Sequence, residues 1–240
     1  MLVAANAMHE PMLRVLIYRD GDSTAADATL ARVANLSALL RLFFEGWVGA
    51  LAARHNVLSA TGHGDDHIYV IYSGGDDLMV VGSWSELPAL AGEIARDFGR
   101  YCGANPAMHL SGGIAVLDAR FPLYQAAEAA GEALEQAKAR EEGGRVVKDA
   151  LDFLGRTVSW SDAGLAGRRA EELAELVAAG GAPRALLRTL MNVAVQEEAA
   201  RRATSTARGA RPDQLAYGPW IWRGTYALAR LAEPSRPPHD

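Results

Sequence analysis

The 240-residue chain has a single cysteine, Cys102, so it forms no internal disulfide framework and no zinc site built from several thiolates. It also lacks a run of consecutive apolar residues long enough to cross a membrane, and it does not open with a cleavable signal pattern. Basic residues are in the minority, with 24 Lys and Arg against 29 Asp and Glu and a net charge of −5. That balance argues against a protein that coats nucleic acid over its whole surface. Together these absences predict a soluble, cytoplasmic protein with no membrane partner.

The most informative stretch, residues 73–77, reads Ser-Gly-Gly-Asp-Asp and lies between two apolar runs, 68–72 and 78–81. Two short apolar runs joined by Gly-Gly predict a β-hairpin, because glycine adopts the positive φ of a tight turn at little cost. Such a turn places two adjacent carboxylates at the rim of a sheet, where they repel each other unless a cation neutralises them. Metal ions held this way drive nucleotidyl and phosphoryl transfer. The same residues are also ordinary turn composition, so a solvated turn is the competing interpretation.

Apolar spacing predicts a regular order of elements around this hairpin. A capping box, Ser83 with Glu86, is expected to start the helix that follows it. The order strand, helix, hairpin, helix, strand, helix, strand predicts an α+β fold with helices on one face of a mainly antiparallel sheet. The expected ranges are a strand over 12–18, a helix over 30–54, a helix over 87–103, a strand over 108–117, a helix from 122 to 143, and a strand over 146–154. Beyond residue 155 the pattern is helical.

Five blocks then occur in a fixed order along the chain. They are Leu42–Trp47, Tyr72–Trp84, Leu110–Ala115, Phe121–Lys138 and Lys148–Gly155. In that order they resemble the large polymerase-bearing subunit of type III CRISPR effector complexes, especially its Csm-type version. The resemblance implies a ferredoxin-like Palm domain over residues 1–155, corresponding to the second Palm domain of that subunit, and an all-helical C-terminal domain over residues 156–240.

The family's activity supplies an expectation for each site residue. Its Gly-Gly-Asp-Asp hairpin binds ATP, the substrate, with Mg²⁺ or Mn²⁺, and joins ATP into cyclic oligoadenylates, a second messenger of antiviral defence. The resemblance thus implies that Asp76 and Asp77 are catalytic metal ligands. Asp20, in Asp20-Gly21-Asp22 after the first strand, stands where the family has a third ligand. The implied nucleotide-binding residues are Ser73, Gly74, Gly75, Lys148 and Lys138, although Ser73 could instead pack beside the turn and either lysine could be a solvated charge.

The resemblance also implies partners. These are other type III CRISPR effector subunits, and guide RNA and target RNA through the complex. The 240 residues contain no counterpart of the family's nuclease domain, first Palm domain or cysteine-rich zinc element. Cleavage of single-stranded DNA is therefore not expected of this chain, and a second Palm domain is expected from another chain or a second copy.

Two other functions stay open at this point. An inactive structural subunit, which docks small helical subunits and guide RNA, is favoured by the short region after Asp22. A stand-alone dimeric cyclic-nucleotide synthase is the other. A basic segment with Arg201, Arg202, Arg208 and Arg211 precedes Trp220 and Trp222; it either contacts RNA or is a solvated loop beside core tryptophans. The polar stretch with His63, Asp65, Asp66 and His67 fits no familiar zinc spacing.

Overall fold

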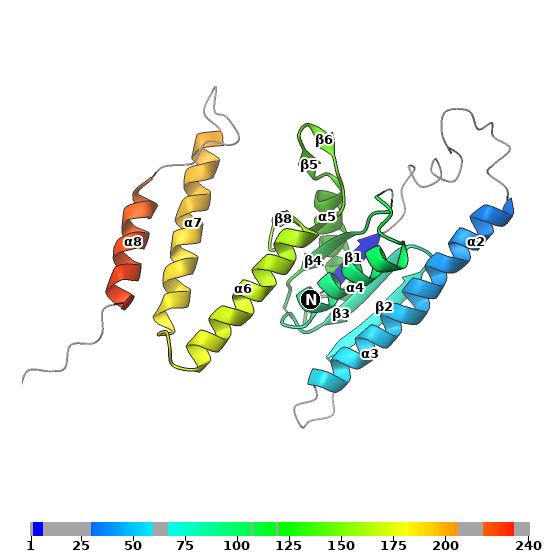
Figure 1. Cartoon of the computed structure of the whole chain (residues 1–240), viewed down its shortest axis with the longest axis horizontal. Coiled ribbons are helices and arrows are strands. Elements are labelled where there is room, and N and C mark those ends of the chain that lie inside the picture. The colour runs from blue at the N-terminus through cyan, green and yellow to red at the C-terminus, as the bar shows by residue number, and fades with distance from the viewer. Residues whose placement is uncertain are drawn as a thin grey trace, which may run out of the picture. The chain divides into compact units, whose positions relative to one another are not determined.

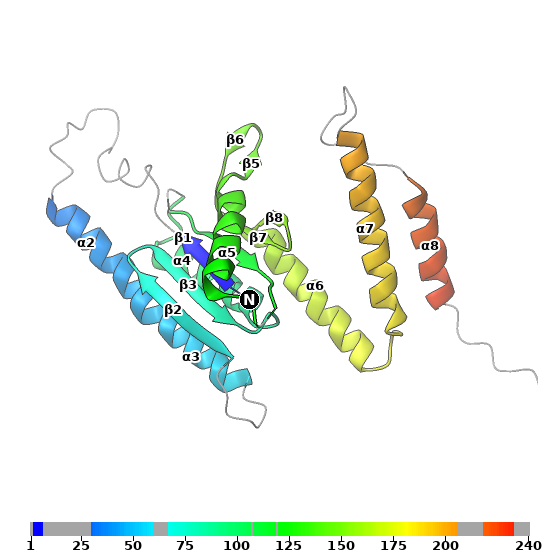
Figure 2. The same ribbon diagram turned by 180° about the vertical axis from the view of Figure 1, so that it is seen from behind.

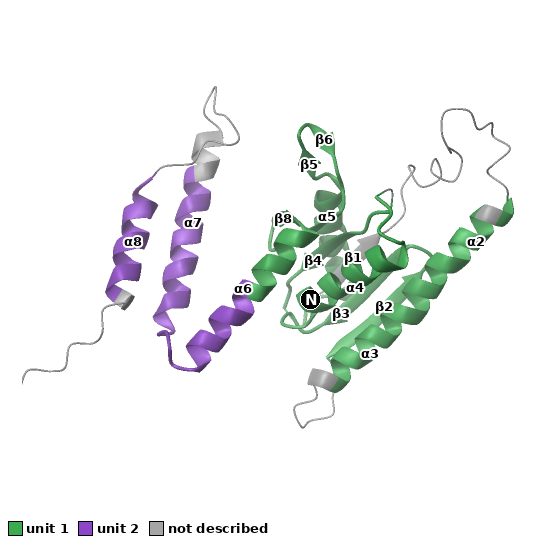
Figure 3. Ribbon diagram, viewed as in Figure 1, with its two compact units in different colours: residues 1–168 green, residues 169–240 purple. Residues whose placement is uncertain are grey.

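The computed structural model describes residues 2–6, 30–59, 67–106, 108–118, 120–205 and 218–232. The chain divides into two compact units, Met1–Arg168 and Arg169–Asp240 (Figure 3). The division lies within a helix, C-terminal to the limit at residue 155 that the resemblance implies.

The first unit contains a six-stranded sheet with the order β2-β3-β1-β4-β7-β8 (Figures 1 and 2). Its strands are β1 (Leu2–Asn6), β2 (Ile68–Gly74), β3 (Asp77–Gly82), β4 (Ser111–Ala115), β7 (Ala150–Phe153) and β8 (Arg156–Ser159). Only the β4–β7 pair is parallel, which confirms a mainly antiparallel sheet. A separate two-stranded ribbon, β5 (Glu141–Glu142) and β6 (Arg145–Val146), was not predicted and neither was β8.

The centre of the sheet is β1, which the apolar spacing did not predict. It pairs with β3 on one side and β4 on the other, with Asn6 opposite Asp77 and Ser111. The strand expected over 12–18, and Asp20 after it, lie outside the described residues.

Helices cover both faces of this sheet, so the prediction that they lie on one face is wrong (Figures 1 and 2). The reason lies in β4, where residues 111–114 are all buried and therefore need cover on both sides. A Cβ on Gly113 would overlap the backbone of Leu134 in α5 (Leu123–Lys138). The neighbouring Ile114 points the other way, into the core formed with the other helices. Those helices are α2 (Leu30–Arg41), the π-helix η2 (Leu42–Trp47), α3 (Val48–Ser59) and α4 (Leu87–Tyr101).

The core on this second face is built around three phenylalanines. The ring of Phe43 contacts those of Phe44 and Phe98, with ring centroids 5.3 Å apart in both pairs. Edge-on contacts of this kind add to the free energy gained by burying the rings. They join the long helix α2–η2–α3 to α4 and so fix the layer beneath the acidic hairpin.

The stretch Val33–Val57 within that long helix has the length and apolarity of a membrane-spanning helix. The run was not recognised in the sequence because Arg41, Glu45 and Arg54 interrupt it. A third of its most apolar 18-residue stretch is buried, and Phe44 is fully buried. The core of the first unit thus accounts for part of the apolar character of this helix, while Leu42 and Val57 stay exposed.

The two ends of α4 differ in how well they were predicted. The helix ends at Tyr101 and Gly103 follows with φ of +63°, as expected for a helix-stopping glycine. The capping box is wrong, because the Ser83 hydroxyl is 2.8 Å from the Ser85 hydroxyl and the Glu86 side chain makes no capping bond.

In the second unit the described residues are mainly helical. They comprise the C-terminal part of α6 (Trp160–Ala178), α7 (Ala185–Ser205) and α8 (Pro219–Ala232). Helices α7 and α8 pack closely, because Gly224 of α8 is buried and lies against Val193 of α7.

Candidate nucleotide and metal site

The predicted hairpin is confirmed, with the turn one residue later than Gly-Gly. Gly74 and Asp77 pair across the two strands, so the turn consists of Gly75 and Asp76. Gly75 has φ of +64°. A positive φ at the first turn residue alone is the pattern of a type II′ turn, which glycine favours at that position.

The two carboxylates occupy different positions at one rim of the sheet. Asp76 is half-buried in the turn, whereas Asp77 is exposed as the first residue of β3. Asp77 lies opposite Asn6, the last residue of β1. The rim therefore presents two adjacent sets of carboxylate oxygens, the ligand type that Mg²⁺ and Mn²⁺ prefer.

Ser73 ties this hairpin to the helical layer. Its hydroxyl donates a hydrogen bond of 2.7 Å to the carbonyl oxygen of Phe44. Phe44 lies in the π-helical turn Leu42–Trp47, and such widened turns are frequent at functional sites. The contact supports the packing interpretation of Ser73, while a nucleotide contact stays a prediction.

Tyr72 lies against Gly74 beside the acidic turn, and the sequence reasoning did not single it out. A Cβ on Gly74 would lie 2.8 Å from the Tyr72 hydroxyl, so the ring covers the glycine backbone. The Tyr72 side chain is still half exposed. Any group that approaches Gly74 from this face meets Tyr72 first. The signal was available, because residues two apart in a strand share a face.

The register of the sheet places Lys148 at the same edge as the acidic turn. Asn6 at the end of β1 is opposite Ser111 at the start of β4, and β7 runs parallel to β4 with Leu151 beside Gly112. The starts of β3, β4 and β7 thus share one edge with the end of β1. Lys148 precedes β7 by two residues. Three strand spacings separate it laterally from Asp77, about 14 Å.

The backbone is strained at this lysine. Lys148 and Asp149 have φ of +53° and +42°, in the left-handed region that residues with a Cβ seldom adopt. Each such residue costs about 1–2 kcal/mol relative to an ordinary conformation. Strained residues of this kind cluster at functional sites.

Lys138 ends α5 and makes an ion pair of 2.9 Å with Glu135. The backbone N–H of Val147 donates to the carbonyl oxygen of Arg140, which closes the β5–β6 ribbon. The ribbon therefore returns the chain from the end of α5 to Lys148. The nucleotide-binding role of Lys138 stays a prediction, and Glu135 already neutralises part of its charge.

Across the residues that the structure describes, no three His, Cys, Asp or Glu side chains gather as a metal site. Asp76 and Asp77 supply two carboxylates. Asp20, the expected third ligand, is outside those residues, as are His63, Asp65 and Asp66. Two carboxylates fit Mg²⁺, which usually keeps several of its own waters when a protein binds it.

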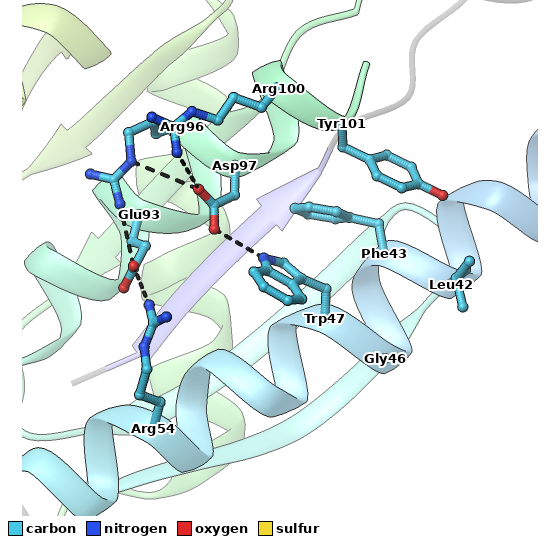
Figure 4. Close-up of a pocket in the computed structure, with 10 residues that line it drawn as sticks. All are labelled: Leu42, Phe43, Gly46, Trp47, Arg54, Glu93, Arg96, Asp97, Arg100 and Tyr101. Carbon is cyan, nitrogen blue, oxygen red and sulfur yellow. Dashed lines mark hydrogen bonds and ion pairs between the residues drawn. The ribbon is translucent and has the colours of Figure 1, made fainter. Parts of the chain in front are cut away.

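A cavity of about 760 Å³ opens elsewhere, between η2 and α4 (Figure 4). Its polar groups already pair with one another, since the Trp47 indole N–H donates to Asp97 at 3.0 Å and Arg54 pairs with Glu93. The acidic turn does not line it. Its volume is typical of ligand pockets, but the carboxylate chemistry lies at the rim of the sheet.

The sheet and its acidic rim together define a Palm domain. The family model for the second palm domain of Cas10/Cmr2 matches residues 12–150, and the chain belongs to this family. Among curated proteins, the chain is 34% identical over 143 residues to a Methanocaldococcus jannaschii protein named CRISPR system single-strand-specific deoxyribonuclease Cas10/Csm1 (subtype III-A). A Thermococcus onnurineus protein of the same name is 32% identical over 129 residues.

These matches cover 56% and 51% of this chain but only 18% and 16% of the relatives' length. Among solved structures, the chain resembles an apo Csm1–Csm4 cassette with a TM-score of 0.57 and 21% identity, over 96% of this chain and 31% of that one. A Csm1–Csm4 cassette in complex with cA4 has a TM-score of 0.58 and 19% identity to this chain, and the match covers 96% of this chain and 36% of that one. At these identities the likeness establishes the fold.

Proposed function

We propose that this chain is the part of a type III CRISPR large subunit that converts ATP to cyclic oligoadenylates. The observation that supports this most is the shared edge of the sheet, which carries two carboxylates and, three strand spacings away, a lysine in a strained conformation. Solved relatives of the same fold have been captured with AMPPNP and with cA4, which are a substrate analogue and a product of this chemistry.

In the proposed reaction the 3′-hydroxyl oxygen of one ATP attacks the α-phosphorus of another. The bond from that phosphorus to the bridging oxygen breaks, pyrophosphate leaves, and the hydroxyl proton passes to solvent. Asp76 and Asp77 hold the divalent ions, which when bound stabilise charge on the attacking and leaving oxygens. Gly75 lets phosphate approach the backbone closely. Lys148 neutralises the triphosphate as a point charge.

Asp20 is the proposed third ligand. The chain leaves β1 at Asn6, opposite Asp77, and Asp20 belongs to the segment between Asn6 and Leu30. The family match begins at residue 12, so it includes Asp20. Replacement of Asp20 by Asn should then weaken product formation as replacement of Asp77 does.

The proposed partners are a second Palm domain and the other subunits of the complex, with guide and target RNA as the trigger. The exposed face of β2 supports the first of these. Tyr69 and Tyr72 are 53% and 55% exposed there, while α5 packs on β1, β4 and β7. An exposed aromatic patch on an edge strand is typical of an interaction surface.

The function is tested by incubating the assembled complex with ATP, Mn²⁺ and matching target RNA, and analysing small products by mass spectrometry. We expect cyclic oligoadenylates from the wild type and none from Asp76→Asn/Asp77→Asn. The control is Glu141→Gln/Glu142→Gln, which removes two adjacent carboxylates beside the other glycine turn and should keep the activity.

The result also separates the alternatives. A folded wild-type complex that forms no product would contradict the proposal and favour a structural subunit that docks small subunits and guide RNA. Product from the chain alone, together with a dimeric mass in light scattering, would identify a stand-alone synthase.

A further inference from the structure

Helix α8 carries two large aromatic side chains on its outer surface. Trp222 is 78% exposed and Tyr226 is 66% exposed. With 3.6 residues per turn, Trp222, Arg223, Tyr226 and Arg230 fall on one face of the helix. Gly224 is on the opposite side, buried against α7. The four side chains therefore form a stripe that faces away from the helix on which α8 packs.

The charge of the surrounding sequence is strongly positive. Residues 199–232 contain six arginines and one aspartate, a net charge of +5, although the whole chain has a net charge of −5. Helix α8 itself has two arginines and no acidic residue. A basic segment in an acidic chain is the electrostatic signature of a contact with a polyanion.

The stripe combines this charge with stacking surfaces. The guanidinium carbon of Arg230 lies 5.9 Å from the centre of the Tyr226 ring, within cation–π range. Four helical residues rise about 6 Å, so Trp222 and Tyr226 are spaced by close to twice the 3.4 Å separation of stacked bases. Proteins that bind unpaired strands use the same combination of aromatic rings and basic groups.

We propose that this α8 stripe binds single-stranded nucleic acid. Trp222 and Tyr226 stack on unpaired bases, and Arg223 and Arg230 contact phosphates. Stacking and phosphate contacts do not read the 2′-hydroxyl, so RNA and DNA strands share the required chemistry. The proposal uses none of the residues of the nucleotide and metal site.

The test measures binding of labelled single-stranded RNA, single-stranded DNA and an RNA duplex to the full chain by fluorescence anisotropy. Trp222→Ala should weaken binding of the single strands by about fivefold to a hundredfold, the range found for loss of one stacked base. The matched control is Trp84→Ala, since Trp84 is 67% exposed in the other unit. It should leave binding unchanged, and the duplex should bind the wild type more weakly than either strand.

The arginines have a separate readout. Loss of one phosphate contact should lower the slope of log affinity against log salt by about 0.7 for a single strand. We expect this for Arg223→Ala and Arg230→Ala, and no change for Arg169→Ala, whose side chain pairs with Glu172.

Equal binding by Trp222→Ala and Trp84→Ala would overturn the proposal. So would a change of oligomeric mass in Trp222→Ala without a change in nucleic-acid affinity, which would identify a protein contact instead. The variant Asp76→Asn/Asp77→Asn should bind the strands normally, so failure here is distinguishable from failure of the proposed synthase activity.

Discussion

The hydroxyl of Ser73 donates a 2.7 Å hydrogen bond to the carbonyl oxygen of Phe44, joining an edge strand to the π-helical turn of the long helix. Asp76 and Asp77 follow Ser73 within four residues. The position of the acidic turn therefore depends on a helix that is 29 residues earlier in the chain.

Replacing Ser73 by Ala should lower the free energy of unfolding by about 1 kcal/mol, because a half-buried carbonyl loses its donor. Denaturant unfolding measures this, and Ser85→Ala is the control, since the Ser85 hydroxyl is bonded only near the surface. Lower stability with unchanged ATP affinity supports the packing role, because a loss of this size leaves the protein folded. A large loss of ATP affinity at unchanged stability would show that Ser73 contacts the nucleotide.

Replacement by alanine should have opposite effects on stability at Gly113 and at Gly131. Gly113→Ala places a Cβ against the backbone of α5, so the helix must shift, and we expect a loss of about 1–3 kcal/mol. Gly131→Ala within α5 meets no atom within 4 Å and should stabilise the protein by up to about 1 kcal/mol. Thermal unfolding of the two variants checks the helix on this face. Equal stability of Gly113→Ala and Gly131→Ala would show that α5 does not lie on β4.

Lys148 combines strain with charge, and two substitutions separate them. Lys148→Gly should be more stable than Lys148→Ala by about 1 kcal/mol, because glycine adopts the positive φ without a Cβ clash. Both variants should bind ATP about tenfold more weakly, since both lose the cation. Isothermal titration measures the affinity. Wild-type affinity in both variants would remove Lys148 from the site.

The hairpin was predictable because its turn chemistry is local. The coverage of both sheet faces was not, since Ser111-Gly112-Gly113 has no apolar pattern that shows which face each residue buries. Strand β1, with two alanines in five residues, carries little β propensity and gains its place from pairing on both sides. The capping box failed because Ser83 bonds Ser85 instead.

For the site, residue types indicated the carboxylates and lysines but not their arrangement. That Lys148 shares an edge with Asp77 follows from the parallel pairing of β4 and β7, which no local pattern specifies. The left-handed backbone at Lys148 and Asp149 is equally invisible in the sequence.

Glu93 makes stability depend on pH. Burial alone would raise the pKa of Glu93, but hydrogen bonds from His55 and Arg54 outweigh it and lower the pKa below its ordinary value near 4.5. A lowered pKa means that the carboxylate stabilises the folded state above that value, and that this is lost as the pH falls through the folded pKa.

We therefore expect wild type to exceed Glu93→Gln in stability at neutral pH, with the difference shrinking below about pH 4. Glu86 also faces His55 at 4.0 Å, and Arg96 faces Glu93 at 3.3 Å. Both Glu86 and Arg96 are the same in the two proteins compared. Urea unfolding at several pH values measures the difference. A difference that grows toward low pH would contradict the assignment.

The central claim is that Asp76 and Asp77 hold divalent ions that carry ATP. It is tested most directly by the melting temperature of the chain with ATP and increasing Mn²⁺, for the wild type and for Asp76→Asn/Asp77→Asn. Binding to the folded state alone stabilises it by about 2.7 kcal/mol at a hundred times the dissociation constant. We predict a saturable rise in the wild type and in Glu141→Gln/Glu142→Gln, and none in the aspartate variant. Identical curves for all three proteins would contradict the account.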